Sequence, residues 1–153
     1  MLETGCAAPA FTLDQMGGGR RSLDQILEQG AALVAFYKIS CPVCQLTLPF
    51  LDRIAAGSLQ VIAISQDDEH GTSKFQQKYG VHLPTLLDRE RDHYPASNAY
   101  GIAHVPSLFL IEKDGRISMA IDGFIKRDLE SIGARAGVAP FHAGEHVPEW
   151  KAG

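Results

Sequence analysis

Two cysteines separated by two residues, Cys41 and Cys44, are the side chains of this sequence best suited to carry chemistry. Paired thiols at this spacing can close a small disulfide ring and exchange it with another disulfide. Zinc sites use the same spacing, so the motif becomes specific only through the elements around it. A tetrahedral zinc site needs two further ligands. The sequence has no second CxxC or CxxH motif, and Cys6 and scattered histidines are the only other candidate cysteine or histidine ligands. A redox pair is therefore favoured, and zinc binding stays an alternative.

The residues that flank the pair predict a strand that leads directly into a helix. Residues 31–37 form a continuous apolar run with the length and branching of a strand buried on both faces of a sheet. Apolar residues then recur at helical spacing from residue 42 to residue 56, and Gly57 ends the run. Cys41 is therefore expected at the amino-terminal end of a helix, and Cys44 is expected one turn further in.

This placement gives the two thiols different expected roles. Unpaired amide groups and the helix dipole stabilise a thiolate at the start of a helix, so Cys41 is the expected nucleophile. Cys44 is less exposed and is placed to resolve a mixed disulfide. Pro42 suits the first helical turn, where its missing amide proton is not needed. Lys38, just upstream, is expected to add positive potential.

The remaining periodicity predicts an α/β domain with a mixed sheet. Strands are expected at residues 59–65, 83–87, 105–111 and 117–121, and helices at residues 23–29, 72–79, 96–100 and 128–136. Strands and helices alternate in the first half, which indicates parallel pairing, whereas Asp114 and Gly115 mark a tight antiparallel hairpin in the second half. Three consecutive glycines at 17–19 predict a peripheral hairpin near the amino terminus.

The chain is expected to form one domain of residues 1–137 followed by a tail of residues 138–153. A length of 153 residues with 45% hydrophobic content suits a single compact core. The tail has no periodicity, and we expect it to wrap the domain or to anchor in a groove. Trp150 is expected to plug a surface groove, because an aromatic ring in a tail gains most by burial.

Charge and hydropathy exclude several classes of partner. The net charge is -4 and the lysines and arginines are scattered, so no nucleic acid or anionic membrane surface is an expected partner. No apolar run approaches the roughly 20 residues that span a bilayer, so no membrane insertion is expected. Residues 1–10 show no basic start followed by an apolar run, which predicts a cytoplasmic protein, or a periplasmic one if a leader has been removed.

Five motifs together resemble a known superfamily. They are the opening segment Ala8–Leu13, the apolar strand leading into Cys41–Cys44, Pro49 within the following helix, Val105–Pro106, and the Asp114–Gly115 hairpin. From residue 5 to about residue 133 the chain is similar to the thioredoxin superfamily. Within it the chain resembles the redoxin branch, which contains TlpA-type thiol-disulfide oxidoreductases and the alkyl hydroperoxide reductase and thiol-specific antioxidant (AhpC/TSA) proteins. The resemblance implies a thioredoxin-like fold, with a central mixed β-sheet flanked by helices and an N-terminal β-hairpin extension.

The resemblance also implies a substrate-binding loop. Val105–Pro106 looks like the cis-proline loop of the family, in which the backbone before the proline turns toward the thiols. That backbone would offer amide and carbonyl groups to an extended substrate. The expected supporting and substrate-binding residues are Pro42, Val43, Val105, Pro106 and Lys38. An ordinary trans proline at the start of an edge strand is the alternative.

Departures from the family pattern limit the resemblance. Ser40 stands where an aromatic residue often precedes the first cysteine, and Ala35 stands where thioredoxins bury an acid. Proton handling by a carboxylate on this strand is therefore not expected. Val34 and Lys38 occupy the positions of the proline and of the threonine or serine that precede the nucleophile in peroxiredoxins. These two residues argue against a peroxiredoxin-type peroxide site.

The favoured function is a thiol-disulfide oxidoreductase that needs no organic cofactor beyond the redox-active disulfide Cys41–Cys44. Its expected partners are a protein or small-molecule disulfide and an external reductant such as a thioredoxin-type or glutathione system. A thiol peroxidase is the second enzyme interpretation, in which peroxide oxidises Cys41 to a sulfenic acid and Cys44 condenses with it. A non-catalytic binding module, or one that holds zinc through the motif, is the interpretation from another class.

The other reactive side chains have plainer interpretations. His104 could tune the thiols, although a loop histidine is more often solvated. His142 and His146 have the spacing of a helical metal pair, but no third ligand accompanies them, so no metal is predicted. Cys6 could serve as a second redox partner, yet a lone cysteine near the amino terminus is usually passive. Residues 67–70 are interpreted as a solvated loop after a strand and not as a cation site.

Overall fold

A mixed sheet forms the centre of the protein in the computed structural model, which describes all 153 residues. Its middle strand, β3 (Ala32–Tyr37), pairs in parallel with β4 (Gln60–Ser65), and β4 pairs in parallel with β5 (Thr85–Leu87). On its other side β3 pairs antiparallel with β6 (Ser107–Ile111), which pairs antiparallel with β7 (Ile117–Asp122). The change of direction at β3 confirms the predicted mixed sheet.

An N-terminal hairpin extends this sheet on the side of β5. Strands β1 (Thr12–Gln15) and β2 (Arg20–Ser22) pair antiparallel, and the three glycines between them all have positive φ angles, which glycine adopts without strain. Because β1 also pairs with β5, the strand order is β2-β1-β5-β4-β3-β6-β7. Helix α1 (Leu23–Glu28) follows directly, and Ser22 and Gln25 close a capping box at its start.

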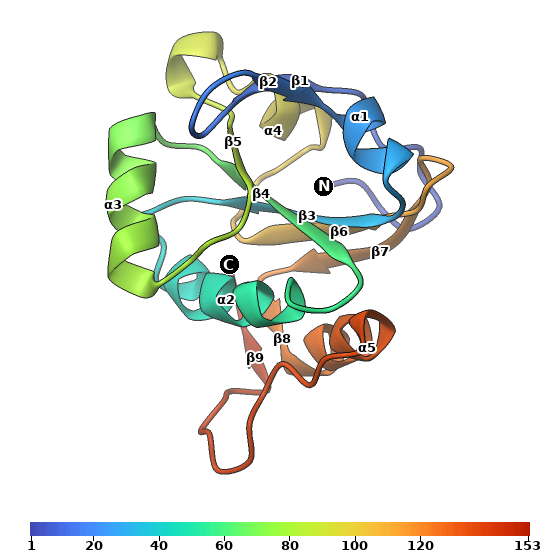
Figure 1. Ribbon diagram of the computed structural model, residues 1–153, viewed down its shortest axis with the longest axis vertical. Coiled ribbons are helices and arrows are strands. Elements are labelled where there is room, and N and C mark those ends of the chain that lie inside the picture. Colours follow the sequence, from blue (N-terminus) through green and yellow to red (C-terminus); the bar gives the residue numbers. More distant parts are fainter.

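Alternation along β3 divides the apolar core into two layers. All six residues of β3 are buried, and successive side chains point to opposite faces of the sheet. The face that carries Tyr37 is covered by three helices, α2 (Pro42–Ile54), α3 (Glu69–Tyr79) and α5 (Lys126–Ala136). The face that carries Phe36 is covered by α1 and by α4 (Pro95–Ala99). Figure 1 shows these helices on the two sides of the sheet.

The acidic loop after β4 is more structured than predicted. Helix α3 begins at Glu69, three residues earlier than expected, because the Asp68 side chain accepts a hydrogen bond from a first-turn N–H and caps the helix. The carboxylate of Asp67 accepts a hydrogen bond of 2.8 Å from the N–H of Ile39, in the loop before α2. The interpretation of residues 67–70 as a solvated loop is therefore wrong, since two of these acids organise neighbouring backbone.

The tail folds back against α2 and ends in a short strand. The ring of Phe141 packs edge-on against that of Phe50 in α2, with 4.8 Å between ring centroids. Strand β9 (Trp150–Lys151) pairs antiparallel with β8 (Phe124–Ile125), which lies between β7 and α5, as Figure 1 shows. The prediction that Trp150 plugs a groove is wrong: its side chain is 62% exposed, because backbone pairing and not ring burial positions this segment.

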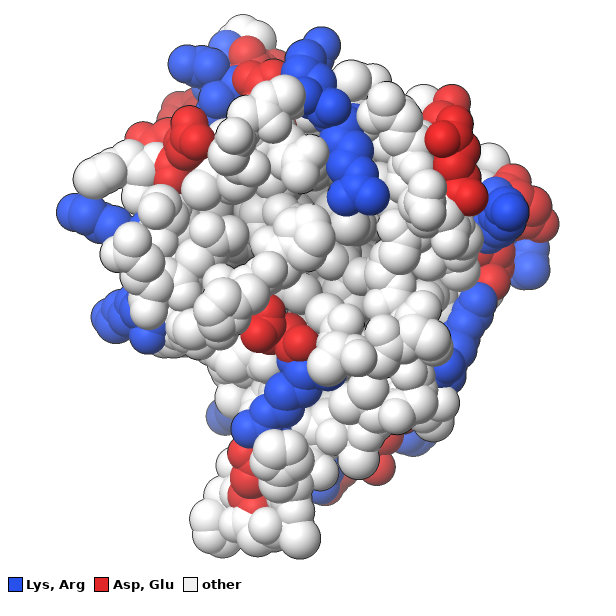
Figure 2. All heavy atoms as spheres, in the orientation of Figure 1, with Lys and Arg blue, Asp and Glu red and all other residues white.

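The outer surface carries charges of both signs. Figure 2 shows a face whose middle is mostly uncharged, with Lys and Arg close to Asp and Glu along its rim. A short 3₁₀ helix, η1 (Glu90–Asp92), adds alternating charges after β5. None of the helices has both the length and the apolar character needed to cross a membrane.

Candidate active site

Cys41 occupies the N-cap position of α2, just after the central strand β3. Its sulfur accepts a hydrogen bond from the N–H of Cys44 (3.1 Å), which satisfies one of the amide groups left unpaired at a helix start. Pro42 follows at the first helical position, where no amide proton is required. The N–H group and the helix dipole both favour a negative charge on the Cys41 sulfur, and this half-buried side chain remains accessible to a substrate.

Cys44 has a different environment although it lies only one helical turn away. Its side chain is fully buried in the same apolar cluster as Tyr37 and Leu48. Burial raises the pKa of the Cys44 thiol, and its contact with the Cys41 sulfur raises that pKa further. Cys44 therefore holds its proton more tightly than an ordinary thiol and is shielded from solvent, whereas Cys41 is accessible, so the two thiols are not chemically equivalent.

Two further polar groups, Tyr37 and Asp67, belong to the electrostatic surroundings of Cys44. Tyr37, at the end of β3, has a buried hydroxyl with no hydrogen-bond partner, and burial raises its pKa, so this hydroxyl stays neutral. The negative charge of Asp67, after β4, adds to the rise in the pKa of Cys44 that burial and Cys41 cause. Ala35 is fully buried, and β3 carries no carboxylate. The acid that acts on Cys44 thus comes from a loop and not from the central strand.

The loop before β6 faces the first turn of α2. Its Val105–Pro106 peptide bond is cis, as predicted. The carbonyl oxygen of Val105 accepts a hydrogen bond from the Cys41 thiol at 3.4 Å, whereas the N–H of Val105 makes no hydrogen bond within the chain. The carbonyl oxygen of Pro106 accepts a hydrogen bond of 2.8 Å from the N–H of Gly123. The Val105 backbone therefore has a free donor close to the reactive sulfur.

Lys38 and Val43 contribute backbone groups to the same site. The carbonyl oxygen of Lys38 accepts a hydrogen bond of 3.2 Å from the N–H of Cys41. A separate backbone hydrogen bond from Lys38 to Cys44 lowers the pKa of that thiol and so partly offsets the rise that burial causes. The carbonyl oxygen of Val43 accepts a hydrogen bond of 2.6 Å from the hydroxyl of Thr47, one turn later in α2. All seven predicted site residues thus lie in the first turn of α2, the loop before it and the facing loop. Their roles in catalysis stay predictions.

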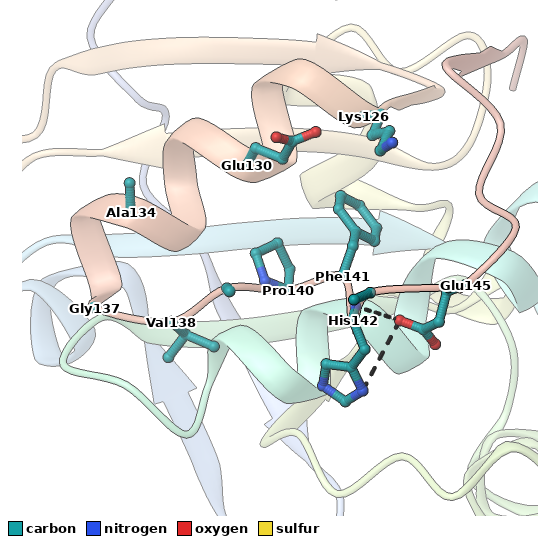
Figure 3. Close-up of a pocket in the computed structure, with 12 residues that line it drawn as sticks. Lys126, Glu130, Ala134, Gly137, Val138, Pro140, Phe141, His142 and Glu145 are labelled. Carbon is teal, nitrogen blue, oxygen red and sulfur yellow. Dashed lines mark hydrogen bonds and ion pairs between the residues drawn. The ribbon is translucent and has the colours of Figure 1, made fainter.

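Two hollows lie elsewhere on the surface, and one of them reaches the loop before α2. This polar hollow of about 980 Å³ is lined by residues 38–39 of that loop, by residues 66–68 after β4, by the start of α3 and by the segment after β5. Another, of about 670 Å³, lies between α5 and residues 137–145 and contains neither Cys41 nor Cys44. Figure 3 shows Glu130 of α5 on one side of this hollow and Phe141 of the tail beside it. It is a gap under the tail and not part of the thiol site.

The remaining reactive side chains lie apart from the thiols or in plain surroundings. Cys6 and His104 are exposed. The backbone N–H of His142 donates to the Glu145 carboxylate at 2.6 Å, which explains this histidine as part of a turn. No three His, Cys, Asp or Glu side chains are arranged to hold a metal ion.

Sequence reasoning missed three residues of this site. Asp67 follows a predicted strand, and its acidic neighbour is a helix-capping signal that could have placed it beside the next helix. Tyr37 lies in the predicted apolar run, and the only signal that sets it apart is the polar hydroxyl that a tyrosine carries at a strand end. Gly123 has φ +84°, and no local pattern indicated that the tail passes beside it.

Named relatives are similar to most of this chain. The thiol-disulfide oxidoreductase ResA of Geobacillus thermodenitrificans is 28% identical over 141 residues, which cover 86% of this chain and 79% of ResA. The thioredoxin domain of a thiol-disulfide oxidoreductase from Bacteroides vulgatus superposes with a TM-score of 0.77 at 22% identity, covering 88% and 98% of the two chains. Peroxidoxin BcpB of Mycobacterium tuberculosis reaches a TM-score of 0.70 at 19% identity, covering 89% and 94%. The structural likenesses establish the thioredoxin-like fold.

The relatives overturn the expected cytoplasmic location. Disulfide oxidoreductases that are similar to this chain include a protein that works outside the cytoplasm. A secreted disulfide oxidoreductase of Mycobacterium tuberculosis superposes on this chain with a TM-score of 0.67 at 20% identity, covering 82% and 95% of the two chains. The prediction failed because it relied on the first ten residues, and the folded domain itself carries no mark of its compartment.

The family is established by a match that contains the whole thiol site. The AhpC/TSA family model matches residues 4–120, which include both cysteines, the Val105–Pro106 loop and every strand of the central sheet except the end of β7. The earlier resemblance to the redoxin branch is confirmed. The chain belongs to the AhpC/TSA family.

Proposed function

We infer that this chain is a thiol-disulfide oxidoreductase that works through Cys41 and Cys44. The observation that carries this inference is the contrast between the two thiols: Cys41 is accessible at the start of α2, and Cys44 is buried one turn away with a raised pKa. A nucleophile that a substrate can reach and a protonated thiol held in reserve are what stepwise disulfide exchange requires. The names of the ResA relatives support the same activity.

The proposed reaction has two exchange steps. The Cys41 thiolate attacks one sulfur of the substrate disulfide, a mixed disulfide forms at Cys41, and the other substrate sulfur leaves as a thiolate. Cys44 then loses its proton and attacks the Cys41 sulfur. A Cys41–Cys44 disulfide forms, and the second substrate thiolate leaves. Two electrons have passed from the enzyme to the substrate, and an external dithiol, or two molecules of a monothiol, returns them in the reverse sequence.

The surroundings of Cys44 couple these two steps. Negative charge at Cys41 disfavours ionisation of Cys44, because the Cys41 sulfur contributes to the raised pKa of that thiol. Formation of the mixed disulfide removes this charge, so the pKa of Cys44 falls when the thiol is needed as a nucleophile. Before that step, burial and the Cys41 sulfur together keep the Cys44 thiol protonated. The order of the steps therefore follows from the electrostatics of the first helical turn.

Protein disulfides are the proposed substrates, and a reductant protein or thiol regenerates the enzyme. More specifically, we expect a thioredoxin-type or glutathione system to supply electrons and small-molecule disulfides to react as well. The proposed reaction uses no organic cofactor, because the redox equivalents reside in the Cys41–Cys44 disulfide. We assign the redox unit to residues 1–137 and treat residues 138–153 as a tail.

Insulin reduction by dithiothreitol tests the proposal. The wild-type protein is expected to accelerate the precipitation of reduced insulin chains, and the Cys41→Ser variant is expected to lose this acceleration. Cys6→Ser is the matched control, since it removes an exposed thiol outside the site and is expected to keep the wild-type rate. Equal rates for wild type and Cys41→Ser would refute the assignment.

A thiol peroxidase is a second candidate, because the AhpC/TSA family contains antioxidant enzymes. Peroxide would transfer one oxygen to the Cys41 thiolate and leave as an alcohol or water, and Cys44 would condense with the sulfenic acid to release water. Val34 and Lys38 do not supply the proline and hydroxyl of a peroxiredoxin site. Stopped-flow measurement of peroxide consumption decides: rapid turnover that Cys41→Ser abolishes would favour the peroxidase.

A further inference from the structure

The end of the tail lies beside the Val105 backbone that faces the reactive thiol. A Cβ atom added to Gly153 would lie 2.7 Å from the carbonyl oxygen of Val105. That same oxygen is 3.4 Å from the Cys41 sulfur. Residue 153 is thus separated from the site of disulfide exchange by a single backbone carbonyl group.

Gly123 is the point where the tail and the substrate loop meet. Its N–H holds the carbonyl oxygen of Pro106 at 2.8 Å. A Cβ atom added to Gly123 would lie 2.4 Å from the carbonyl oxygen of Lys151 and 2.9 Å from the N–H nitrogen of Gly153. Only glycine permits so close a backbone approach at φ +84°, so the tail fits against this loop without a side chain between them.

The tail reaches this position as an added strand. Phe124 pairs with Lys151 and Ile125 with Trp150, in antiparallel register. The carbonyl oxygen of Glu149 also accepts the N–H of Lys126 at 3.0 Å. An extended peptide that adds to a sheet edge uses the same backbone hydrogen bonds. Residues 149–153 therefore occupy the edge beside Val105 in the manner of a bound polypeptide.

We propose that residues 149–153 set the substrate preference of the thiol site, by filling the docking edge beside Val105 that an extended polypeptide disulfide would need. This inference rests on the proposed oxidoreductase function. A small disulfide needs only the accessible Cys41 sulfur, so it reacts with the tail in place. A polypeptide disulfide must first displace the tail before its backbone can pair beside Val105.

The contacts of this segment are weak enough for a substrate to displace it. Its ladder is two residues long, and the Trp150 side chain is 62% exposed. The ion pair between Glu149 and Lys126 spans 3.6 Å, with the glutamate side chain 84% exposed, and exposed ion pairs contribute little to stability. The preceding part of the tail is held more firmly, because Phe141 packs against Phe50 and Glu145 accepts two hydrogen bonds from Arg53 of α2. Residues 149–153 can therefore detach while the preceding part of the tail stays in place.

A deletion of residues 149–153 tests the proposal in the otherwise intact chain. Rates with insulin and with oxidised glutathione are compared under the same reductant. The deletion is expected to raise the insulin rate at least threefold and to leave the glutathione rate within twofold of wild type. If the glutathione rate is retained but the insulin rate is unchanged or lower, the proposed role of the tail is wrong, while the oxidoreductase activity stands. Failure of the wild type to reduce either disulfide would overturn the underlying activity.

Fluorescence of the full-length protein gives a second measurement that needs no deletion. Trp150 is the single tryptophan, so its anisotropy reports on the tail directly. Carboxymethylated insulin B chain, which has no tryptophan and cannot exchange disulfides, serves as the extended ligand. Its addition is expected to lower the anisotropy of Trp150 in a saturable manner, whereas reduced glutathione leaves it unchanged. A constant anisotropy at saturating B chain would contradict displacement of the tail.

Discussion

The first turn of α2 and the end of the tail after β9 both approach Val105, yet they are held in opposite ways. In α2, Cys44 is fully buried within a cluster of 20 apolar residues. In β9, both residues are exposed, and the pairing with β8 is two residues long. One side of the site is thus fixed by the core, and the other side is held by a few surface contacts.

This difference separates two tasks that a disulfide-exchange site must perform. The two sulfurs must keep a fixed relation, because the Cys44 N–H and its thiol act on Cys41 over about one helical turn. Substrates vary in size, so the docking side benefits from a segment that can move. Elements with few buried contacts open locally at low free-energy cost, whereas core helices do not.

The largest effect is expected from Cys44→Ser, which removes the buried thiol on the side of the site that the core holds in place. The variant can form a mixed disulfide at Cys41 but cannot resolve it, so turnover of insulin should fall by roughly two orders of magnitude or more. Mass spectrometry under non-reducing conditions should detect the trapped adduct. Cys6→Ser serves as the control, and full turnover by Cys44→Ser would show that Cys44 is not the resolving thiol.

The contrast in packing predicts different costs in stability. Leu48→Ala removes a fully buried side chain from the helix beside Cys44 and should lower the free energy of unfolding by about 2–5 kcal/mol. Trp150→Ala changes an exposed side chain and should cost no more than about 0.5 kcal/mol. Urea unfolding of both variants measures these values. Equal losses would show that the tail strand is as firmly held as the core.

The influence of Asp67 on Cys44 can be measured in the background of Cys41→Ser. Asp67→Asn keeps an oxygen that can accept the N–H of Ile39 but removes the negative charge. Because that charge helps to raise the pKa of Cys44, its removal should lower the pKa. The pH profile of Cys44 alkylation by iodoacetamide should therefore shift to lower pH. An unchanged pH profile would show that the charge of Asp67 does not raise the pKa of Cys44.

The smallest effect is expected at the ion pair that anchors the tail. Hydrogen bonds from Arg53 hold the pKa of Glu145 at about 2, below its ordinary value of 4.5. A lowered pKa means that this contribution to stability is present above pH 4.5 and is lost as the pH falls toward 2. The difference in Tm between wild type and Glu145→Gln should therefore shrink over that range. A difference that is constant from pH 7 to pH 2 would contradict this reasoning.

The sequence predicted the elements whose signals are local. The apolar run of β3, the helical spacing of α2 and the glycines of the first hairpin all led to elements that the structure contains. The start of α3 was missed, because the capping bond of Asp68 outweighs the weak apolar pattern that begins at Thr72. Helix starts depend on such single bonds, which hydrophobic periodicity does not report.

The site was predictable only where its residues belong to one motif. Cys41 and Cys44 lie in one short segment, and their expected difference in exposure is found in the structure. Asp67 and Tyr37 meet because β3 and β4 pair in parallel, with Tyr37 opposite Ser65. The contact of the tail with Gly123 joins residues that are far apart in the chain. Contacts of this kind follow from register and chain path, which spacing alone does not determine.

The central claim is that Cys41 and Cys44 cycle between a dithiol and a single disulfide. A titration against mixtures of reduced and oxidised glutathione, followed by alkylation and mass spectrometry, tests it most directly. The account predicts one reversible two-electron transition, in which both cysteines lose alkylation together while Cys6 stays alkylated. Persistent alkylation of Cys41 and Cys44 across the whole titration, or a disulfide that joins either of them to Cys6, would contradict it.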